Sequence, residues 1–454
     1  MENLSLLTDL YELTMAECYF HYKKNTLATF DLFVRELPTN RRYLVAAGLE
    51  DVLAYIKTLA FSKEDIAYLK KEKLFSKAFL KYLSSFRFHG DIWAMPEGEI
   101  FFPNEPVIRV TAPIIEAQII ESFFLNTINL QSMIASKASR VVSAAKKRGV
   151  YDFSLRRTHG WQAGIKAARS CYIAGCKGTS NVLAGKLYKI PVAGTMAHSF
   201  VMSFKNEIDS FLAYSSIFPS RTILLVDTYN TRKGIQNAVK IGLYLRAEGN
   251  RLQGIRLDSG DIISLSKMAR RLLDKAGLEY VKIFASGNLD EFKIKKIIAA
   301  SSYVDNFGVG TNMGTSIDAP SLDVIYKISE VTNDEGEFLP TMKLSKAKVT
   351  YPGRKQVFRI KNKNGNFVQD ILGLEKEKIP GEPLLKKVVA KGKVIYKSPS
   401  LDKIRDYLGG NLKKFPDGLK EIDSRYSYVV QISPKLKKLR QSLAQQLKKR
   451  QLNG

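Results

Sequence analysis

The sequence predicts an α/β protein whose central part forms a barrel of parallel strands and helices. Two observations indicate this fold class. Between about residues 185 and 330, apolar runs of strand length alternate with helix-like segments, and polar residues follow the runs. The runs are residues 190–193, 222–226, 255–257, 281–285 and 304–309. Near-continuous apolar strands that alternate with helices indicate a parallel sheet buried on both faces.

The segments between the runs have helical periodicity. Apolar residues recur on one helical face at 235, 239 and 242–243 after the second run, and at 292, 294 and 297–298 after the fourth. Such βα units fit either a barrel or a doubly wound sheet. Polar segments follow the runs at 194–198, 227–228, 258–261, 286–288 and 308–311. Several strands that bring polar ends to one face favour the barrel, because barrel active sites have this layout.

Both ends of the chain have a different character. Residues 1–135 mix short strands and helices punctuated by prolines, and β signals return after about residue 335 around the turn dipeptide Asn364-Gly365. We therefore expect an α+β domain of residues 1–135 completed by 336–425, and a barrel domain of residues 136–335. Residues 426–454 form a basic helix or tail, in which leucines at 436, 439, 443 and 447 have helical spacing. A docked helix is favoured over a membrane-surface or nucleic-acid tail.

Composition excludes several classes of protein. The 454 residues are 45% hydrophobic and 25% charged, which is typical of a globular protein with more than one core. The longest apolar stretch of the first half, residues 114–125, is interrupted by two glutamates and falls short of the roughly 18 residues of a membrane span. Residues 1–9 lack the features of a secretion signal. We expect a soluble, cytoplasmic protein.

The cysteines and histidines do not indicate a disulfide framework or a zinc site. Only Cys18, Cys171 and Cys176 are present, without CxxC spacing, and the four histidines lack an HxxxH arrangement. Any metal would therefore be held by oxygen ligands and phosphate.

The charge balance raises nucleic-acid binding as an alternative. The 71 Lys and Arg against 44 Asp and Glu give a net charge of +27, and the pI is near 9.7. The basic residues are mostly lysines spread along the chain, without zinc-finger spacing or an RNP-like aromatic signature. Basic charge permits nucleic-acid binding but does not diagnose it, so we do not expect it as the main function.

Two neighbouring strand ends resemble a phosphate site. Residues 306–311 place Gly308 and Gly310 after a strand, where backbone N–H groups can approach an anion and Thr311 adds a hydroxyl. Alone, this pattern is often only a tight turn. Gly287 and Asn288 supply a second loop after the preceding strand, at the place where barrels usually hold phosphate.

Charged residues and one histidine are expected beside these loops. Arg256 and Asp258 lie two apart, so they point the same way if the strand extends that far. With Asp261 they suit a ribose diol and a magnesium–pyrophosphate group, although structural charge pairing is the common alternative. His198 follows a small, polar segment, and neutral imidazole is a good nucleophile for a phosphoryl group.

Five segments, in order from near the N-terminus to about residue 360, resemble the signatures of nicotinate phosphoribosyltransferases. They are Leu6-Leu7-Thr8-Asp9-Leu10-Tyr11-Glu12-Leu13-Thr14-Met15, residues 178–184, 194–200 and 256–261, and Pro352-Gly353-Arg354-Lys355-Gln356-Val357. The resemblance implies a type II phosphoribosyltransferase: a homodimer with an irregular TIM-like α/β barrel and a second domain built from both chain ends.

The resemblance also implies the reaction. Nicotinate is joined to phosphoribosyl pyrophosphate to give nicotinate mononucleotide and pyrophosphate in NAD biosynthesis, with Mg²⁺ and with ATP hydrolysis coupled through a phosphohistidine. By motif, His198 is the phosphorylated residue, and Tyr11 from the second subunit stacks on the pyridine ring opposite Phe153. Thr195 and Arg256 lie against nicotinate, and Asp258, with Asp261 as a second candidate, takes ribose hydroxyls or magnesium. The ribose 5-phosphate is held by Gly287, Asn288, Gly308, Gly310 and Thr311.

The choice of substrate depends on two residues. Relatives that use nicotinamide carry an Asp where this chain has Ser180, and Arg156 adds a second cation near Phe153. Both differences favour a carboxylate. His159 departs from the family pattern and is expected to be a loop residue. Nicotinamide or quinolinate phosphoribosyl transfer, and a nucleic-acid-binding protein on a barrel scaffold, are the alternatives.

Overall fold

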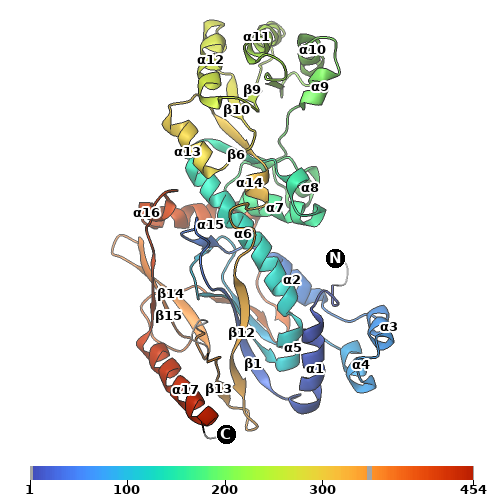
Figure 1. Ribbon diagram of the computed structural model, residues 1–454, viewed down its shortest axis with the longest axis vertical. Helices are drawn as coiled ribbons and strands as arrows, with labels where there is room; N and C mark the ends of the chain where they lie inside the picture. The colour runs from blue at the N-terminus through green and yellow to red at the C-terminus, as the bar shows by residue number, and fades with distance from the viewer. Residues whose placement is uncertain (1–3, 345–349, 453–454) are drawn as a thin grey trace. The chain divides into compact units, whose positions relative to one another are not determined.

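The computed structural model describes residues 4–344 and 350–452. The chain divides into two compact units (Figure 1). Unit 1 comprises residues 1–133, 321–420 and 425–454, and unit 2 comprises residues 134–320 and 421–424. Among the described residues, no helix combines the length and the apolar character that crossing a membrane requires.

Unit 2 is built on a parallel sheet of six strands in the order β7-β6-β11-β10-β9-β8. The strands are β6 (Gly149–Asp152), β7 (Gly178–Thr179), β8 (Ile223–Leu225), β9 (Gly254–Leu257), β10 (Lys282–Ala285) and β11 (Asn306–Val309). Val192 adds an isolated parallel bridge to Thr179. The predicted α/β class with a parallel sheet is confirmed, whereas closure of this sheet into a barrel stays a prediction.

Four of the five predicted apolar runs are strands β8 to β11, and the run 190–193 makes only the isolated bridge. Strands β6 and β7 lie before the region in which strands were expected. Both are short, four and two residues. They extend the sheet beyond β11 and bring two further strand ends to its carboxyl edge.

Helices connect the strands of unit 2, and their apolar faces are buried. In α11 the predicted face includes Ile235, which is fully buried, and in α13 Ile294 is fully buried, but the prediction was wrong for Leu243 and Phe292, which are 37% and 41% exposed. The helices are the second part of α6 (Glu121–Ala145), α7 (Trp161–Ile173), α8 (Val182–Tyr188), α9 (His198–Met202), α10 (Glu207–Ile217), α11 (Thr231–Ala247), α12 (Ile262–Lys275), α13 (Glu291–Ala299) and α14 (Thr311–Gly314), with a 3-10 helix at Leu155–Arg157. Burial of the apolar residues of these helices stabilises the parallel sheet.

Unit 1 contains a seven-stranded antiparallel sheet in the order β13-β12-β1-β5-β3-β17-β18. These strands are β1 (Leu27–Val34), β3 (Asp91–Ala94), β5 (Pro106–Pro113), β12 (Val324–Thr332), β13 (Phe338–Pro340), β17 (Lys386–Ala390) and β18 (Lys393–Val394). A four-stranded sheet joins β14 (Lys355–Lys361), β15 (Phe367–Leu374), β16 (Glu382–Pro383) and β19 (Val429–Ile432), and β2 (Leu44–Val45) pairs with β4 (Ile100–Phe101).

The helices of unit 1 come from both parts of the chain. They are α1 (Leu10–Tyr22), α2 (Leu49–Thr58), α3 (Lys63–Lys71), α4 (Lys77–Ser84), α5 (Ile114–Ile119), the first part of α6, α15 (Leu401–Lys414), α16 (Asp417–Lys420) and α17 (Pro434–Leu452). Leu436 of α17 is fully buried. This agrees with a docked helix, since a helix that only lay in solvent would bury no leucine.

Two segments lie in a different unit from the one the sequence analysis gave them. Residues 321–335 were assigned to the barrel domain, but β12 pairs along its length with β1, side by side in Figure 1. Residues 426–454 were given as a separate tail, but β19 pairs in parallel with β15. Both segments belong to unit 1, since strands β12 and β19 form backbone hydrogen bonds with its sheets.

Candidate active site

A cavity of about 730 Å³ lies at the carboxyl ends of the strands of unit 2. Loops after β6, β7, β9, β10 and β11 contribute to its wall, as does the segment that leads into α9. Its lining comprises Phe153, Leu155, Arg156, Arg157, Ser180, residues 194–198, Arg256, Asp258, residues 286–288, Gly308, Gly310, Thr311, Asn312 and Ile317. Ligand sites of α/β sheets occur at this edge, which makes the cavity the candidate active site.

The cavity gathers most of the residues that the sequence analysis singled out. They are Phe153, Arg156, Ser180, Thr195, His198, Arg256, Asp258, Gly287, Asn288, Gly308, Gly310 and Thr311. Asp261 does not line the cavity, since its carboxylate caps α12 by accepting from the Ile263 N–H at 3.1 Å. His159 is exposed and also outside the lining. Tyr11 lies in unit 1, on α1, with 47% of its surface exposed.

His198 is held at one ring nitrogen and faces a carboxylate with the other. Its Nδ1 lies 3.1 Å from the Thr228 hydroxyl, and its Nε2 lies 3.7 Å from Asp258 Oδ2. The second distance is longer than a hydrogen bond. The other oxygen of Asp258 accepts from the Ser286 hydroxyl. Because Nδ1 is fixed by Thr228, the arrangement orients Nε2 toward the polar side of the cavity.

Asp227 supports this group from behind, a role that the sequence analysis missed. Its carboxylate accepts from the Asp258 N–H at 2.8 Å and from the Ser259 hydroxyl at 2.7 Å. The side chain is buried, and Oδ1 has no hydrogen-bond partner in the described part of the chain. Its position, directly after the apolar run of β8, was visible in the sequence and was the available signal.

Arg256 on β9 presents a guanidinium group to the cavity. Its Nη2 donates to the Met196 carbonyl at 3.0 Å, whereas the buried Nε has no partner within the described residues. Burial lowers the pKa of Arg256, and the nearby carboxylates of Asp258 and Asp227 oppose that shift. A half-satisfied guanidinium in a cavity wall is suited to bind a carboxylate or phosphate through its remaining N–H donors.

Glycines allow the loops after β10 and β11 to approach their neighbours. Gly287 has a φ of +90°, and a Cβ there would lie 1.9 Å from the backbone oxygen of Asp258. At Gly308 a Cβ would lie 2.5 Å from the Phe153 ring. The two loops are tied together by Asn312, whose amide donates to Asn288 Oδ1 at 3.1 Å. Larger residues would displace both loops, so the glycines set the shape of this end of the cavity.

Asp152 organises the opposite wall and was also missed. Its carboxylate accepts from the Ser154 N–H at 2.9 Å and the Thr179 hydroxyl at 2.7 Å. Thr179 in turn accepts from the Asn181 N–H at 3.0 Å. Burial raises the pKa of Asp152, and the hydrogen bonds from Ser154 and Thr179 act against that shift. This carboxylate therefore joins the loop that carries Phe153 to the loop that carries Ser180.

The oxygen ligands in the cavity are few. Within residues 4–344 and 350–452, no cluster of three or more His, Cys, Asp or Glu side chains is arranged around a metal position. Asp258 offers one carboxylate, and Ser286 beside it offers a hydroxyl. Such a donor set fits Mg²⁺ only if phosphate oxygens and water complete its coordination, which is common for this ion.

Comparisons with known proteins place the chain in one family. Residues 6–129, 149–369 and 381–440 match, respectively, the nicotinate phosphoribosyltransferase N-terminal domain, the nicotinate phosphoribosyltransferase family and its C-terminal domain. A nicotinate phosphoribosyltransferase of Mycobacterium tuberculosis is 47% identical over 436 residues, covering 95% of this chain and 92% of that protein. The Bacillus subtilis enzyme of that name is 37% identical over 465 residues, covering 95% and 93%. The crystal structure of human nicotinic acid phosphoribosyltransferase superposes with a TM-score of 0.86 at 28% identity, covering 96% of this chain and 99% of that one.

Proposed function

Because the chain belongs to the nicotinate phosphoribosyltransferase family and is an enzyme of that kind, we propose that the cavity of unit 2 joins nicotinate to phosphoribosyl pyrophosphate. The products are pyrophosphate and nicotinate mononucleotide, and the mononucleotide serves NAD biosynthesis. The observation that carries the proposal is the meeting of Arg256, His198 and the two glycine loops in one cavity.

Arg256 and Thr195 bind the pyridine acid. The N–H groups that Arg256 leaves unused can grip a carboxylate, while its bond to Met196 fixes the guanidinium plane. Phe153 gives the flat ring a stacking surface. In a homodimer, the partner subunit's Tyr11 closes the other face of the ring. The sheet of unit 2 closes into an irregular barrel around this site.

The loops after β10 and β11 hold the ribose 5-phosphate. Gly287, Gly308, Gly310 and Thr311 line one end of the cavity, where backbone N–H groups and the Thr311 hydroxyl would donate to an anion. Asp258 faces the ribose hydroxyls, and Mg²⁺, when bound, neutralises the charge of the departing pyrophosphate. Positive charge develops on the ribosyl carbon as that bond breaks, so correctly placed carboxylate and hydroxyl oxygens contribute more than a general base.

His198 couples the reaction to ATP. With its proton on Nδ1, facing the Thr228 oxygen, the ring has an unprotonated Nε2, which forms a bond to the γ-phosphorus of ATP as the bond from that phosphorus to the ADP oxygen breaks and ADP leaves. Asp258, whose Oδ2 lies 3.7 Å from Nε2, stabilises the positive charge that the ring carries until Nδ1 loses its proton. Hydrolysis of the phosphohistidine then favours product release over the reverse reaction.

Substrate choice rests on Ser180 and Arg156. Ser180 gives no carboxylate to accept from an amide N–H, and Arg156 adds positive charge to the same wall. Both features favour nicotinate over nicotinamide. The test is an assay with phosphoribosyl pyrophosphate, Mg²⁺ and nicotinate, nicotinamide or quinolinate in turn, with and without ATP. Mononucleotide from nicotinamide alone would refute the proposal, and product from quinolinate alone would support the second candidate reaction.

The role of His198 has its own test. His198→Ala should retain slow transfer at saturating nicotinate but lose ATP hydrolysis that accompanies turnover, because the acceptor atom is gone. Thr228→Val is the graded control, since it removes the bond to Nδ1 and keeps the ring. If His198→Ala still hydrolysed ATP in step with product, another residue would have to accept the phosphoryl group.

A further inference from the structure

The first turn of α1 presents Tyr11 at the surface of unit 1 beside two leucines. Tyr11 is 47% exposed, and Leu7 and Leu10 are 51% and 57% exposed. Large apolar side chains that gather at one place on a surface mark a contact with another molecule. A ring that stacks on a ligand binds more tightly when it is already held in one orientation, because less freedom is lost on binding. The contacts that hold this turn therefore affect what Tyr11 can do.

Ser122, the second residue of α6, holds the turn on both sides of Tyr11. Its Oγ lies 2.5 Å from Asp9 Oδ2 and 2.8 Å from Glu12 Oε1, and it accepts from the Asp9 N–H at 3.1 Å. The Ser122 N–H donates to Glu12 Oε1 at 3.0 Å. Asp9 is the N-cap residue of α1, but its carboxylate makes no capping bond and faces Ser122 instead. One serine thus joins the residues that precede and follow Tyr11.

Glu12 makes this link costly to break, because its side chain is fully buried. Its carboxylate also accepts from the Thr8 hydroxyl, and that hydroxyl lies 3.2 Å from the Ile119 carbonyl. A buried carboxylate that loses its hydrogen-bond donors destabilises the fold. The start of α1 is therefore fixed against the start of α6.

Glu121, which precedes Ser122, faces the other end of the tyrosine. Its buried carboxylate interacts with the Tyr11 hydroxyl and accepts from Gln118 Nε2 at 2.7 Å. Burial, together with the carboxylates of Glu121 and Glu12, raises the pKa of Tyr11, so the hydroxyl keeps its proton and can donate to Glu121. Two consecutive residues at the start of α6 thus constrain both the backbone turn and the side chain of Tyr11.

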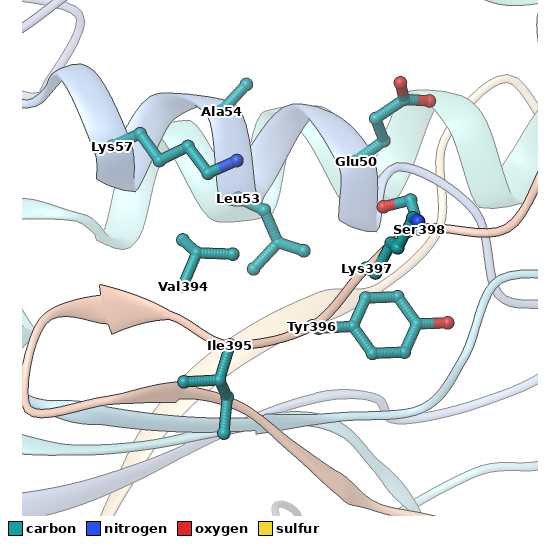
Figure 2. Close-up of a pocket in the computed structure, with 9 residues that line it drawn as sticks. All are labelled: Glu50, Leu53, Ala54, Lys57, Val394, Ile395, Tyr396, Lys397 and Ser398. Atoms are coloured by element: carbon teal, nitrogen blue, oxygen red, sulfur yellow. The ribbon is translucent and has the colours of Figure 1, made fainter.

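Another partly exposed tyrosine of unit 1 provides a comparison. Tyr396 lies in the wall of a cavity of about 510 Å³ between α2 and residues 394–398 (Figure 2). This segment lies mostly outside helices and strands, and the N–H groups of Ile395 and Tyr396 donate to the Val388 carbonyl at 3.0 and 3.2 Å. The backbone near Tyr396 is thus held by a strand, whereas the turn that carries Tyr11 is held by a serine side chain.

We propose that Ser122 is a positioning residue for the transfer reaction. It fixes the first turn of α1 so that Tyr11 stacks on the pyridine ring bound in the cavity of the other subunit. Ser122 contacts no substrate in this arrangement and acts through Tyr11. The inference rests on the stacking role proposed for Tyr11, and it adds the residue that makes the tyrosine effective.

Steady-state kinetics of the full-length enzyme test this role. Ser122→Ala should raise KM for nicotinate about tenfold and change KM for phosphoribosyl pyrophosphate less than about twofold, since a displaced ring loses contact only with the pyridine. Ser122→Thr keeps the hydroxyl and should restore the wild-type KM. An equal rise of both KM values in Ser122→Ala would make Ser122 a structural residue and overturn the proposal.

Two control variants separate this effect from general damage to unit 1. Ser132→Ala removes another hydroxyl of α6, which bonds to the backbone N–H and carbonyl of Ala47, both at 3.2 Å. Tyr396→Ala removes the comparison ring. Both controls should leave KM for nicotinate unchanged. A rise in Ser132→Ala as large as that in Ser122→Ala would overturn the proposal.

A double variant tests whether the effect passes through the ring. In a Tyr11→Ala background, Ser122→Ala should cause no further rise in KM for nicotinate, because the group that it positions is already absent. Additive effects of the two substitutions would show that Ser122 acts by another route and would overturn the proposal.

Mixed dimers test whether Ser122 serves the site of the other subunit. When Ser122→Ala and Arg256→Gln chains are co-expressed, one site of each mixed dimer combines an intact cavity with an intact α1. At subsaturating nicotinate the mixture should show about one quarter of wild-type activity, against about one twentieth if Ser122 acted on the cavity of its own subunit.

Tyr11→Ala co-expressed with Arg256→Gln is the reference pair for this experiment. Restoration by the reference pair but not by the Ser122→Ala pair would overturn the inference alone. Failure of both pairs would refute the shared site of the proposed function and the inference with it.

Discussion

A buried arginine of unit 1 is fully paired with carboxylates, whereas an arginine in the cavity of unit 2 is only partly paired. In unit 1, Arg359 is 1% exposed, donates to both oxygens of Asp370 at 2.9 and 2.6 Å, and also pairs with Glu99. In the cavity of unit 2, Arg256 donates one hydrogen bond to the Met196 carbonyl, and its buried Nε has no partner among the described residues. A charged group can be buried at low cost only when it is paired and hydrogen-bonded. A charged group that is incompletely paired at a strand end keeps hydrogen-bond donors for a ligand.

The largest effect is expected when the buried guanidinium of unit 1 is removed. Arg359→Met should reduce the free energy of unfolding by about 3–5 kcal/mol, because Glu99 and Asp370 are then left buried without a cation. Lys361→Met is the matched control on the same strand, since its pair with Glu382 at 2.7 Å is about 40% exposed on each side. That control should cost about 0–1 kcal/mol. The measurement is the denaturant midpoint, and equal losses for the two variants would contradict the comparison.

The second prediction concerns the incompletely paired arginine. Arg256→Gln should lower kcat/KM for nicotinate about 100-fold, since a charged double hydrogen bond to the substrate carboxylate is lost. The preference for nicotinate over nicotinamide should fall as well. The denaturant midpoint should change far less than in Arg359→Met. A loss of stability as large as that of Arg359→Met would make Arg256 a structural residue.

The sequence allowed prediction of the parallel strands and of the residues at their ends, because both properties are local. An apolar run such as 222–226 and the polar residues after it are adjacent in the chain, and parallel strands bring their carboxyl ends to one edge. The pairing of β12 is not a local property of the sequence. This strand pairs with β1, which lies far away in the chain, and hydrophobic periodicity does not indicate which strands pair.

The supporting carboxylates were missed for a related reason. Asp152 and Asp227 act through hydrogen bonds to other residues, and an aspartate after a strand is equally consistent with a turn or a helix cap. Asp261 is the opposite case, a residue for which a binding role was predicted and which makes a structural contact. It was proposed as a metal ligand, but its place before Ile262 is also the pattern of an N-cap, and in the structure it caps α12.

A smaller effect is expected at the carboxylate that joins two loops of the cavity. Asp152→Asn should raise KM for nicotinate about tenfold with a lesser change in kcat, because it loosens the acceptor for Ser154 and Thr179 rather than a group on substrate. Ser154→Ala, which removes one hydroxyl donor, should have the same direction and a smaller size. A fall in kcat at unchanged KM would instead place Asp152 in the chemical step.

The smallest effect is expected at a buried carboxylate of unit 1 that accepts hydrogen bonds from hydroxyls and a backbone N–H and has no cation as its partner. Glu12 accepts from Thr8 and from Ser122, and burial raises its pKa to about 7. The folded protein therefore keeps this proton up to about pH 7, whereas the unfolded chain loses it near 4.5.

This group accordingly lowers stability as pH rises from about 4.5 to about 7, and the loss is complete above the folded pKa. Glu12→Gln removes that dependence. The Tm of the variant relative to wild type should rise by about 2 °C between pH 5 and pH 8, measured by calorimetry at both values. Parallel Tm curves would show that Glu12 is ionised in the folded protein at pH 5. The hydrogen bonds to Glu12 would then be sufficient to stabilise its buried carboxylate. Pairing with a cation would not be required for every buried charge of unit 1.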